Sequence, residues 1–327
     1  MRSLLAGVAL LVAVGAPALA ADRPLPSWND TPRRDAIITY IERITKDGGS
    51  YFVPPEDRIA VFDNDGTLWS EQPLYPQIYF IVDRVKELAE LNPGWKTQEP
   101  FASVLKGDLG AALSGGYEAL EALSAGTMAN MTTTAFTESV KKWIATAKNP
   151  DKDRRFLDMT FQPMLELLDY LRANQFQIYI VSGSDTDFVR AFSVEAYGVE
   201  PQYVVGSEPK MRFQFNSGGF NIWRLPEPGF VSDGPGKPVA IENHIGRKPI
   251  FAFGNSDGDM EMLQYVCVDP SMTFCGVIHH TDGVREFAYD TAIGMGQLDK
   301  MLPAAEVNGW SVVNMKTDWS VVYPPAK

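Results

Sequence analysis

Three short apolar runs in the chain each end abruptly in a cluster of small polar residues. The runs are residues 59–62, 177–181 and 249–253, and the clusters that follow them are Asp-Asn-Asp-Gly, Ser-Gly-Ser and Gly-Asn-Ser-Asp-Gly-Asp. Apolar runs of this length are typical of parallel strands that are buried on both faces. Because the carboxyl ends of parallel strands meet at one edge of a sheet, we expect the three polar clusters to form a single site.

A different pattern separates the first run from the second. Helical periodicity covers residues 75–91, 98–107, 116–124 and 133–148, and strand signals are almost absent there. The later residues again alternate between strands and helices. We therefore predict an α/β fold, a Rossmann-like doubly wound parallel sheet with a helical cap inserted after the first strand.

The same patterns predict the domain organisation. The chain divides into a signal peptide (1–20), an N-terminal arm with a helix (21–50), a core in two parts (51–74 and 160–327) and a cap (75–159). Within the core, two apolar segments flank Asn-Ser-Gly-Gly and predict a small hairpin insert at about residues 207–228. A helix is expected at 186–197, short strands at 203–205, 273–278 and 310–314, and another helix at 297–307.

The first 20 residues resemble an export signal. Arg2 precedes an apolar stretch, residues 4–14, and Ala-Leu-Ala at 18–20 is a small-x-small cleavage site. We expect a periplasmic or secreted protein with no stable membrane association after cleavage. The net charge of −12, without a basic tail, argues against a nucleic-acid partner. Cys267 and Cys275 could pair in an oxidising compartment or be ordinary core residues.

Two carboxylates follow the first apolar run, at Asp63 and Asp65. Residues two apart on an extended segment point to the same side, so both could face one centre. An ordinary strand followed by an Asp-Gly turn would give the same local pattern. Taken with the other two clusters, the pair suits phosphoryl transfer, because a carboxylate can form an aspartyl-phosphate and a second one can act as general acid and base.

The remaining parts of such a site are also present. A serine hydroxyl, a backbone N–H and a lysine can hold the phosphoryl oxygens, and Mg²⁺ can offset their charge with oxygen ligands from two strand ends. The residues that would supply these groups are Ser182, Gly183, Lys237 and Asn255.

Four segments resemble the four motifs of the haloacid dehalogenase superfamily, in its phosphoserine phosphatase-like form. They are DNDGT at 63–67, IYIVSGS at 178–184, DGPGK at 233–237 and FGNSDGDMEML at 253–263. The resemblance implies that Asp63 is the nucleophile and a metal ligand. It implies that Asp65 is the general acid and base, with its carbonyl on Mg²⁺. Ser182 and Lys237 would hold the phosphoryl group.

Asn255 departs from that pattern, because the family usually has a metal-binding Asp there. An amide oxygen can ligate Mg²⁺ but adds no negative charge, so we expect weaker metal binding. Asp259 aligns with the second carboxylate of the motif, and Asp257 could also substitute. Glu71 falls close to where phosphoserine phosphatase-like members contact a substrate amino group, although a surface Glu would fit equally well.

The predicted activity is that of a Mg²⁺-dependent phosphatase acting on a small phosphorylated metabolite. Two alternatives stay open: a phosphotransferase with an alcohol acceptor, and a non-catalytic periplasmic binding protein with a weakened metal site. The C-terminal segment is expected to be structural. His279, His280 and Asp282 are expected to have structural or surface roles, because adjacent strand residues face opposite ways.

Overall fold

The computed structural model describes residues 23–216, 219–290 and 296–325. The predicted signal peptide, residues 1–20, lies outside the described residues. Among the helices in the described ranges, none is long and apolar enough to cross a membrane.

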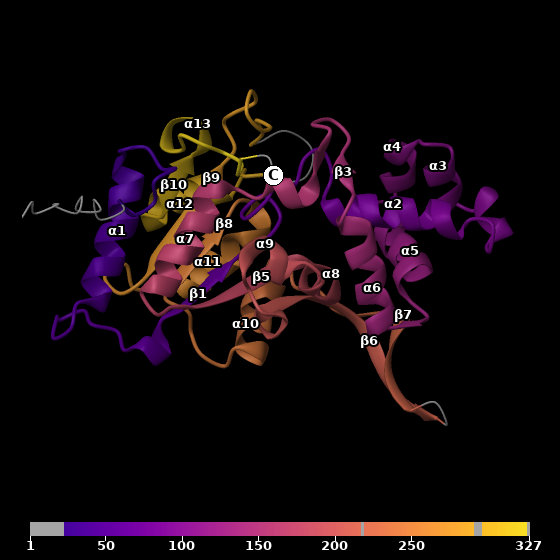
Figure 1. The fold of residues 1–327 in the computed structure, drawn as a ribbon, viewed down its shortest axis with the longest axis horizontal. Helices are drawn as coiled ribbons and strands as arrows, with labels where there is room; N and C mark the ends of the chain where they lie inside the picture. Colours follow the sequence, from indigo (N-terminus) through magenta and orange to yellow (C-terminus); the bar gives the residue numbers. More distant parts are fainter. Residues whose placement is uncertain (1–22, 217–218, 291–295, 326–327) are drawn as a thin grey trace, which may run out of the picture.

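An eight-stranded sheet runs through the molecule, and its β6–β7 hairpin projects from the body (Figure 1). Its strand order is β10-β9-β8-β1-β5-β6-β7-β2, and the six strands from β10 to β6 are parallel. In that order the strands are Ser311–Asn314, Phe274–His279, Phe251–Gly254, Ile59–Phe62, Gln177–Asp185, Val204–Asn216, Gly219–Phe230 and Met131–Thr132. The predicted α/β fold with a mostly parallel sheet is confirmed.

Each face of the sheet is covered by helices. Side chains alternate along β1, so Ala60 and Phe62 pack in one core while Ile59 and Val61 pack in the other. The first core includes buried residues of α1 (Pro32–Thr45) and α7 (Gln162–Ala173). The second includes those of α10 (Gly236–His244), α11 (Met260–Val266) and α12 (Met301–Asn308). The disulfide between Cys267 and Cys275 joins the end of α11 to β9.

The segment predicted as the cap contains five α-helices beside the core (Figure 1). They are α2 (Pro76–Leu88), α3 (Phe101–Leu105), α4 (Leu109–Leu113), α5 (Gly116–Met128) and α6 (Thr133–Ile144). The short strand β2 follows α5 and pairs with β7, so the cap also contributes to the main sheet. Two further short strands, β3 (Lys148–Asn149) and β4 (Arg154–Arg155), pair with each other. The domain boundaries themselves stay predictions.

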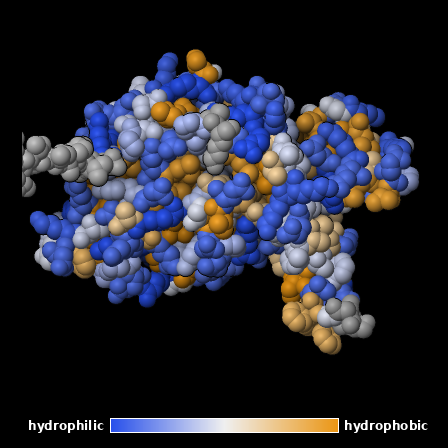
Figure 2. Space-filling view, viewed as in Figure 1, coloured by the Kyte–Doolittle hydropathy of each residue, from blue (hydrophilic) through white to orange (hydrophobic). Residues whose placement is uncertain are grey.

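The hairpin differs from the expected small insert. β6 runs without a break from the core into the hairpin: it pairs with β5 as far as Ser207 and with β7 from Glu208 onward. The predicted strand at 203–205 is therefore the first part of a longer strand. Apolar side chains are exposed toward the far end of the hairpin, where Phe213, Phe215 and Phe220 lie (Figure 2).

The predicted helix at 186–197 is divided into α8 (Thr186–Arg190) and α9 (Ser193–Tyr197).

Arg224 on β7 connects the hairpin to the core and to the cap. Its guanidinium is buried and bonds to the carboxylates of Asp185 (2.5 Å) and Asp187 (2.7 Å) at the start of α8. It also donates to the carbonyl of Met128 (3.0 Å) and lies over the ring of Phe136 in α6. A buried cation with two carboxylate partners is costly to disrupt, so these contacts fix the hairpin against both neighbours.

Candidate active site

The three predicted strand ends lie side by side at the carboxyl-terminal edge of the sheet, where the parallel strands end. β8, β1 and β5 are adjacent and parallel. Asp63 directly follows β1, and its backbone N–H donates to the carbonyl of Phe253 in β8 (3.0 Å). The structure therefore brings Asp63, Asp65, Ser182 and Asn255 to the same edge of the sheet, as the sequence pattern predicts.

Lys237, in the first turn of α10, reaches into this edge. Its Nζ donates to Oδ1 of Asp63 (2.5 Å), to Oδ1 of Asp259 (2.6 Å) and to the carbonyl of Val181 (2.9 Å). Burial disfavours its charge, but Asp259 and Asp63 outweigh this and raise the pKa of Lys237 above its ordinary value. Lys237 is thus a fixed, buried cation that joins its own motif segment to the other three.

The carboxylates outnumber the cations at this edge. Burial raises the pKa of Asp63 well above its ordinary range; Asp259 raises it further, and Lys237 lowers it. Asp63, Asp65, Glu71 and Asp259 are all buried. Buried carboxylates need a paired cation, so a site with this balance favours a further positive charge.

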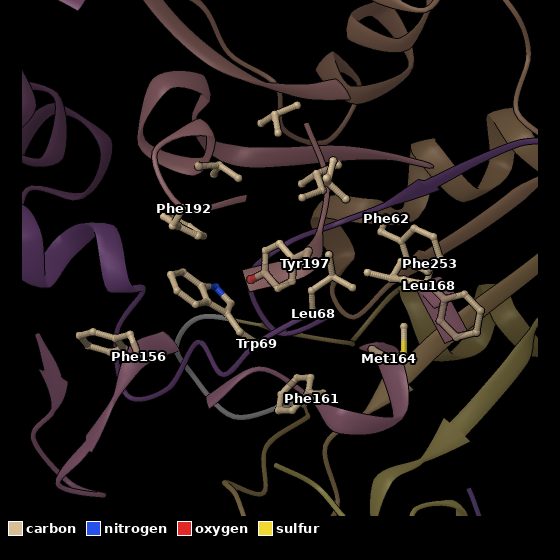
Figure 3. Close-up of a cluster of buried hydrophobic side chains, with 14 of the residues drawn as sticks. Phe62, Leu68, Trp69, Phe156, Phe161, Met164, Leu168, Phe192, Tyr197 and Phe253 are labelled. Carbon is tan, nitrogen blue, oxygen red and sulfur yellow. The ribbon is translucent and has the colours of Figure 1, made fainter. Parts of the chain in front are cut away.

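Asp65 is held by the hydrophobic core. The indole N–H of Trp69 donates to its Oδ1 (2.8 Å), and the hydroxyl of Ser184 donates to its Oδ2 (2.7 Å). Trp69 stacks on Phe192, with ring centroids 4.7 Å apart, inside the cluster shown in Figure 3. Burial raises the pKa of Asp65, although these two hydrogen bonds lower it. Asp65 can therefore retain a proton at higher pH than an exposed Asp.

The turn after Asp65 requires glycine. Gly66 has a φ of +75°, and a Cβ at this position would lie 2.0 Å from Nδ2 of Asn255. The Gly66 carbonyl oxygen lies 2.7 Å from Nε2 of His280, whose Nδ1 lies 3.1 Å from Glu286. His280 is buried and has the structural role that the sequence suggests, although its contact is with the turn of the site itself.

Asn255 and Glu71 are partners of each other. Nδ2 of Asn255 donates to Oε1 of Glu71 (2.8 Å), and its Oδ1 accepts from the hydroxyl of Thr67 (3.0 Å). The same Oε1 of Glu71 accepts from the hydroxyl of Tyr289 (2.8 Å). Glu71 is not a surface residue, and one of its oxygens already has two protein donors.

The last residues of β5, which the structure extends to Asp185, contribute unequally to the site. A cavity of about 320 Å³ opens at this edge of the sheet, and Gly183 and Ser184 line it. Ser182 is fully buried behind them, and its Oγ accepts from the backbone N–H of Ser184 (3.1 Å). The other predicted site residues that line the cavity are Asp63, Asp65, Glu71, Lys237 and Asp259.

The acidic residues after β8 have separate roles. Asp259 accepts from Lys237 through Oδ1 and from the backbone N–H of Asn255 through Oδ2 (2.9 Å). Asp257 instead accepts from the backbone N–H groups of Lys300 and Met301 (3.0 and 2.8 Å) at the start of α12. Asp257 therefore caps that helix and does not line the cavity, whereas Asp259 does. Asn255 and Asp259 stay the candidate metal ligands of this segment.

The donor set suits Mg²⁺. No group of three or more His, Cys, Asp or Glu side chains in the described ranges is arranged to hold a metal ion. Mg²⁺, however, usually takes only one or two carboxylates and keeps several waters. The Asp63 carboxylate, the Asp65 carbonyl and an oxygen of Asn255 or Asp259 would be enough. The buried carboxylates in excess of Lys237 also favour a divalent cation.

Glu71 should make the metal-free protein sensitive to pH. Burial raises the pKa of Glu71 well above its ordinary value of 4.5, although Tyr289 lowers it. The folded state then binds more protons than the unfolded state above about pH 4.5. The free energy of unfolding in EDTA should fall as pH rises from that value, by at most about 1.4 kcal/mol per pH unit for this group. Denaturant melts at several pH values give the free energy of unfolding, which should change less with pH for Glu71→Gln than for the wild type. The same pH dependence in both proteins would contradict the raised pKa of Glu71.

Asn255→Asp should bind Mg²⁺ more tightly but fold less stably without it. The new carboxylate would face Glu71 in place of a donor, at a cost of about 1–3 kcal/mol in EDTA. Adding Glu71→Gln should restore stability, because a glutamine amide can donate to the new carboxylate. Thermal melts in EDTA and the Mg²⁺ dependence of activity measure both effects. Equal stability of Asn255→Asp and wild type in EDTA would count against the Asn255–Glu71 contact.

Sequence reasoning missed two residues at this site. Ser184 contacts Asp65, whereas only Ser182 and Gly183 of its segment were predicted to act. Tyr289 contacts Glu71 from the C-terminal segment, which was expected to be structural. The repeated Ser in Ser-Gly-Ser could have indicated the first. No local pattern indicates the second, since 218 positions separate Tyr289 from Glu71.

Comparison with known proteins gives one informative match. The family model for haloacid dehalogenase-like hydrolases matches residues 60–264. No curated protein matches the chain.

Solved structures give weaker likenesses. A protein of unknown function from Bordetella pertussis is 16% identical (TM-score 0.48, covering 79% of this chain and 98% of that one). A conserved protein of unknown function from Anaerococcus prevotii is 18% identical (TM-score 0.49, covering 85% of this chain and 90% of that one). A probable phosphoserine phosphatase from Vibrio cholerae is 15% identical (0.38, 86% and 70%).

Proposed function

Because the chain belongs to the family of haloacid dehalogenase-like hydrolases, we propose that it is a Mg²⁺-dependent phosphatase acting on a small phosphomonoester through an aspartyl-phosphate on Asp63. One observation supports this most strongly. Lys237 lies between Asp63 and Asp259 at the carboxyl ends of the parallel strands, and Asp65 lines the same cavity. A nucleophile, an acid and a fixed cation are thus available to one bound phosphate.

The reaction would proceed in two steps. An oxygen of Asp63 attacks phosphorus, a new oxygen–phosphorus bond forms, and the bond to the alcohol oxygen breaks. Asp65 gives its proton to that leaving oxygen. Water then attacks the phosphorus of the acyl-phosphate, and Asp65 accepts a proton from the water. The bond between phosphorus and the Asp63 oxygen breaks, which releases inorganic phosphate and restores the Asp63 carboxylate.

Other residues would hold the phosphoryl group. Lys237 offers its ammonium group, and Gly183 offers a backbone N–H at the cavity wall. Ser182 stays the predicted hydroxyl donor, and Ser184 lies nearer the cavity. Mg²⁺, held by Asp63, the Asp65 carbonyl and an oxygen of Asn255 or Asp259, would offset the negative charge of the phosphate.

Hydrolysis of p-nitrophenyl phosphate tests the proposal. We expect turnover by the wild-type protein that EDTA abolishes and added Mg²⁺ restores. If wild type and Asp63→Asn release p-nitrophenol equally under every metal tried, the protein is not this enzyme. Repeating the assay with an alcohol acceptor separates hydrolysis from transfer, since a transferase would release less inorganic phosphate than p-nitrophenol.

We also propose that the mature protein is exported and acts on a small phosphorylated metabolite in the periplasm or outside the cell. The proposal rests on the pattern of residues 1–20. N-terminal sequencing of protein recovered from an exporting host should begin at residue 21 or 22. An intact Met1 in that fraction would contradict it.

A further inference from the structure

The cavity extends from the catalytic carboxylates to the cap and the hairpin. One end is formed by Asp63, Asp65 and Lys237, and the other lies between α5 and the base of β7. A phosphate at the first end would place the alcohol part of the substrate in the second. The second end therefore determines which alcohols fit.

The walls of that second end are largely apolar. Side chains from α2, α5 and β7 supply most of the carbon surface. They include Ile78, Ile81, Leu120, Met128, Leu225 and Phe230. Pockets with such walls bind apolar groups, and a few polar residues then select among them.

The cations of the cavity are both already paired. Lys237 and Arg224 are its only cationic lining residues within the described ranges. Lys237 lies at the phosphate end, between Asp63 and Asp259, where it would contact the phosphoryl group, and Arg224 bonds to Asp185 and Asp187. Both cations are almost fully buried, with exposed fractions of 2% and 1%. Neither is available to a second anionic group on the substrate.

The remaining charges near the second end are negative. Glu121 on α5, Glu208 on β6 and Glu227 on β7 line the cavity. An anionic group on the alcohol would lie near these carboxylates in a partly desolvated space, without a cation to balance it. A cationic group would be attracted to the same residues.

We propose that the substrate is a phosphomonoester of an apolar alcohol that carries no anionic group, and that a cationic group on the alcohol favours binding. This inference rests on the proposed phosphatase function and specifies its substrate class. It excludes esters with a second phosphate or a carboxylate, which includes the phosphoserine type of substrate despite the motif resemblance.

Three matched esters test the inference: phenyl phosphate and its 4-aminomethyl and 4-carboxymethyl derivatives. A methylene separates each charge from the ring, which keeps the leaving groups similar in reactivity. For the full wild-type chain with Mg²⁺, kcat/KM for the carboxymethyl ester should be at least about tenfold below that for the aminomethyl ester, with phenyl phosphate between them. Equal values, or a preference for the carboxymethyl ester, would overturn the inference and leave the phosphatase proposal intact.

Charge reversal in the cavity gives the second arm. Glu121→Lys should raise kcat/KM for the carboxymethyl ester and lower it for the aminomethyl ester. Glu118→Lys is the matched control, since Glu118 is an exposed residue one helical turn away on α5 that does not line the cavity. Equal effects of the two variants would overturn the inference. No hydrolysis of any ester by the wild type would instead refute the phosphatase function, and the inference with it.

Discussion

Asp63→Asn should reduce kcat/KM for p-nitrophenyl phosphate by about four orders of magnitude or more, because an amide cannot form the acyl-phosphate. The variant should nevertheless fold. Asp63 is one of several buried carboxylates, and burial together with Asp259 raises its pKa. Replacing it removes charge that the folded protein accommodates poorly. A thermal melt in EDTA should therefore show stability close to that of the wild type.

Asp65→Asn provides the matched comparison. If Asp65 protonates the leaving oxygen, its loss should matter less for p-nitrophenyl phosphate, whose leaving group needs little protonation, than for an alkyl phosphate. Asp63→Asn should reduce turnover of both esters to the same degree. Two variants with the same substrate dependence would contradict the separate roles of nucleophile and acid. Steady-state rates on the two esters decide the question.

Lys237→Met should lower both stability and activity. The change leaves Asp63 and Asp259 buried and facing each other without the ammonium group that now bonds to both. Breaking a buried ion pair from one side costs about 3–5 kcal/mol. The loss should be smaller at low pH, where Asp63, whose pKa is raised by burial, takes up a proton. Denaturant melts at several pH values in EDTA measure it.

Two further variants separate charge from chemistry at Lys237. Lys237→Met with Asp259→Asn should recover part of the stability, because one of the two opposed carboxylates is removed. Lys237→Arg keeps the positive charge but changes its geometry, so it should fold better than Lys237→Met and still lose most activity. Wild-type stability for Lys237→Met at neutral pH would contradict the role of Lys237 as the fixed cation.

The edge of the sheet that forms the site was predictable because its signals are local. Each of β1, β5 and β8 contains a short apolar run with small polar residues directly after it, which in β5 still belong to the strand. The parallel topology then brings these polar residues together. Lys237 needed more than local pattern, because a lysine near the start of a helix is usually solvated. Its role was predicted from the polar clusters on the three strands and from the motif resemblance.

The contacts between distant segments were not predictable. Asn255 was recognised as a departure from the motif, but its bond to Glu71 depends on the spatial meeting of β8 with the loop after β1. Tyr289 reaches Glu71 from a segment without any motif. The sequence pattern predicted a strand at 203–205 and a separate hairpin, where the structure has the single long strand β6. That β6 pairs first with β5 and then with β7 depends on contacts between distant segments.

The most direct test is to identify the phosphorylated residue. Wild-type protein mixed with substrate and Mg²⁺ and quenched in acid within one turnover should contain a phosphoryl group on the peptide with residues 58–69, and fragmentation should place it on Asp63. Borohydride reduction should convert that acyl-phosphate to homoserine at position 63. Phosphate on another residue, or no phosphoenzyme at any time during continuing turnover, would contradict the account.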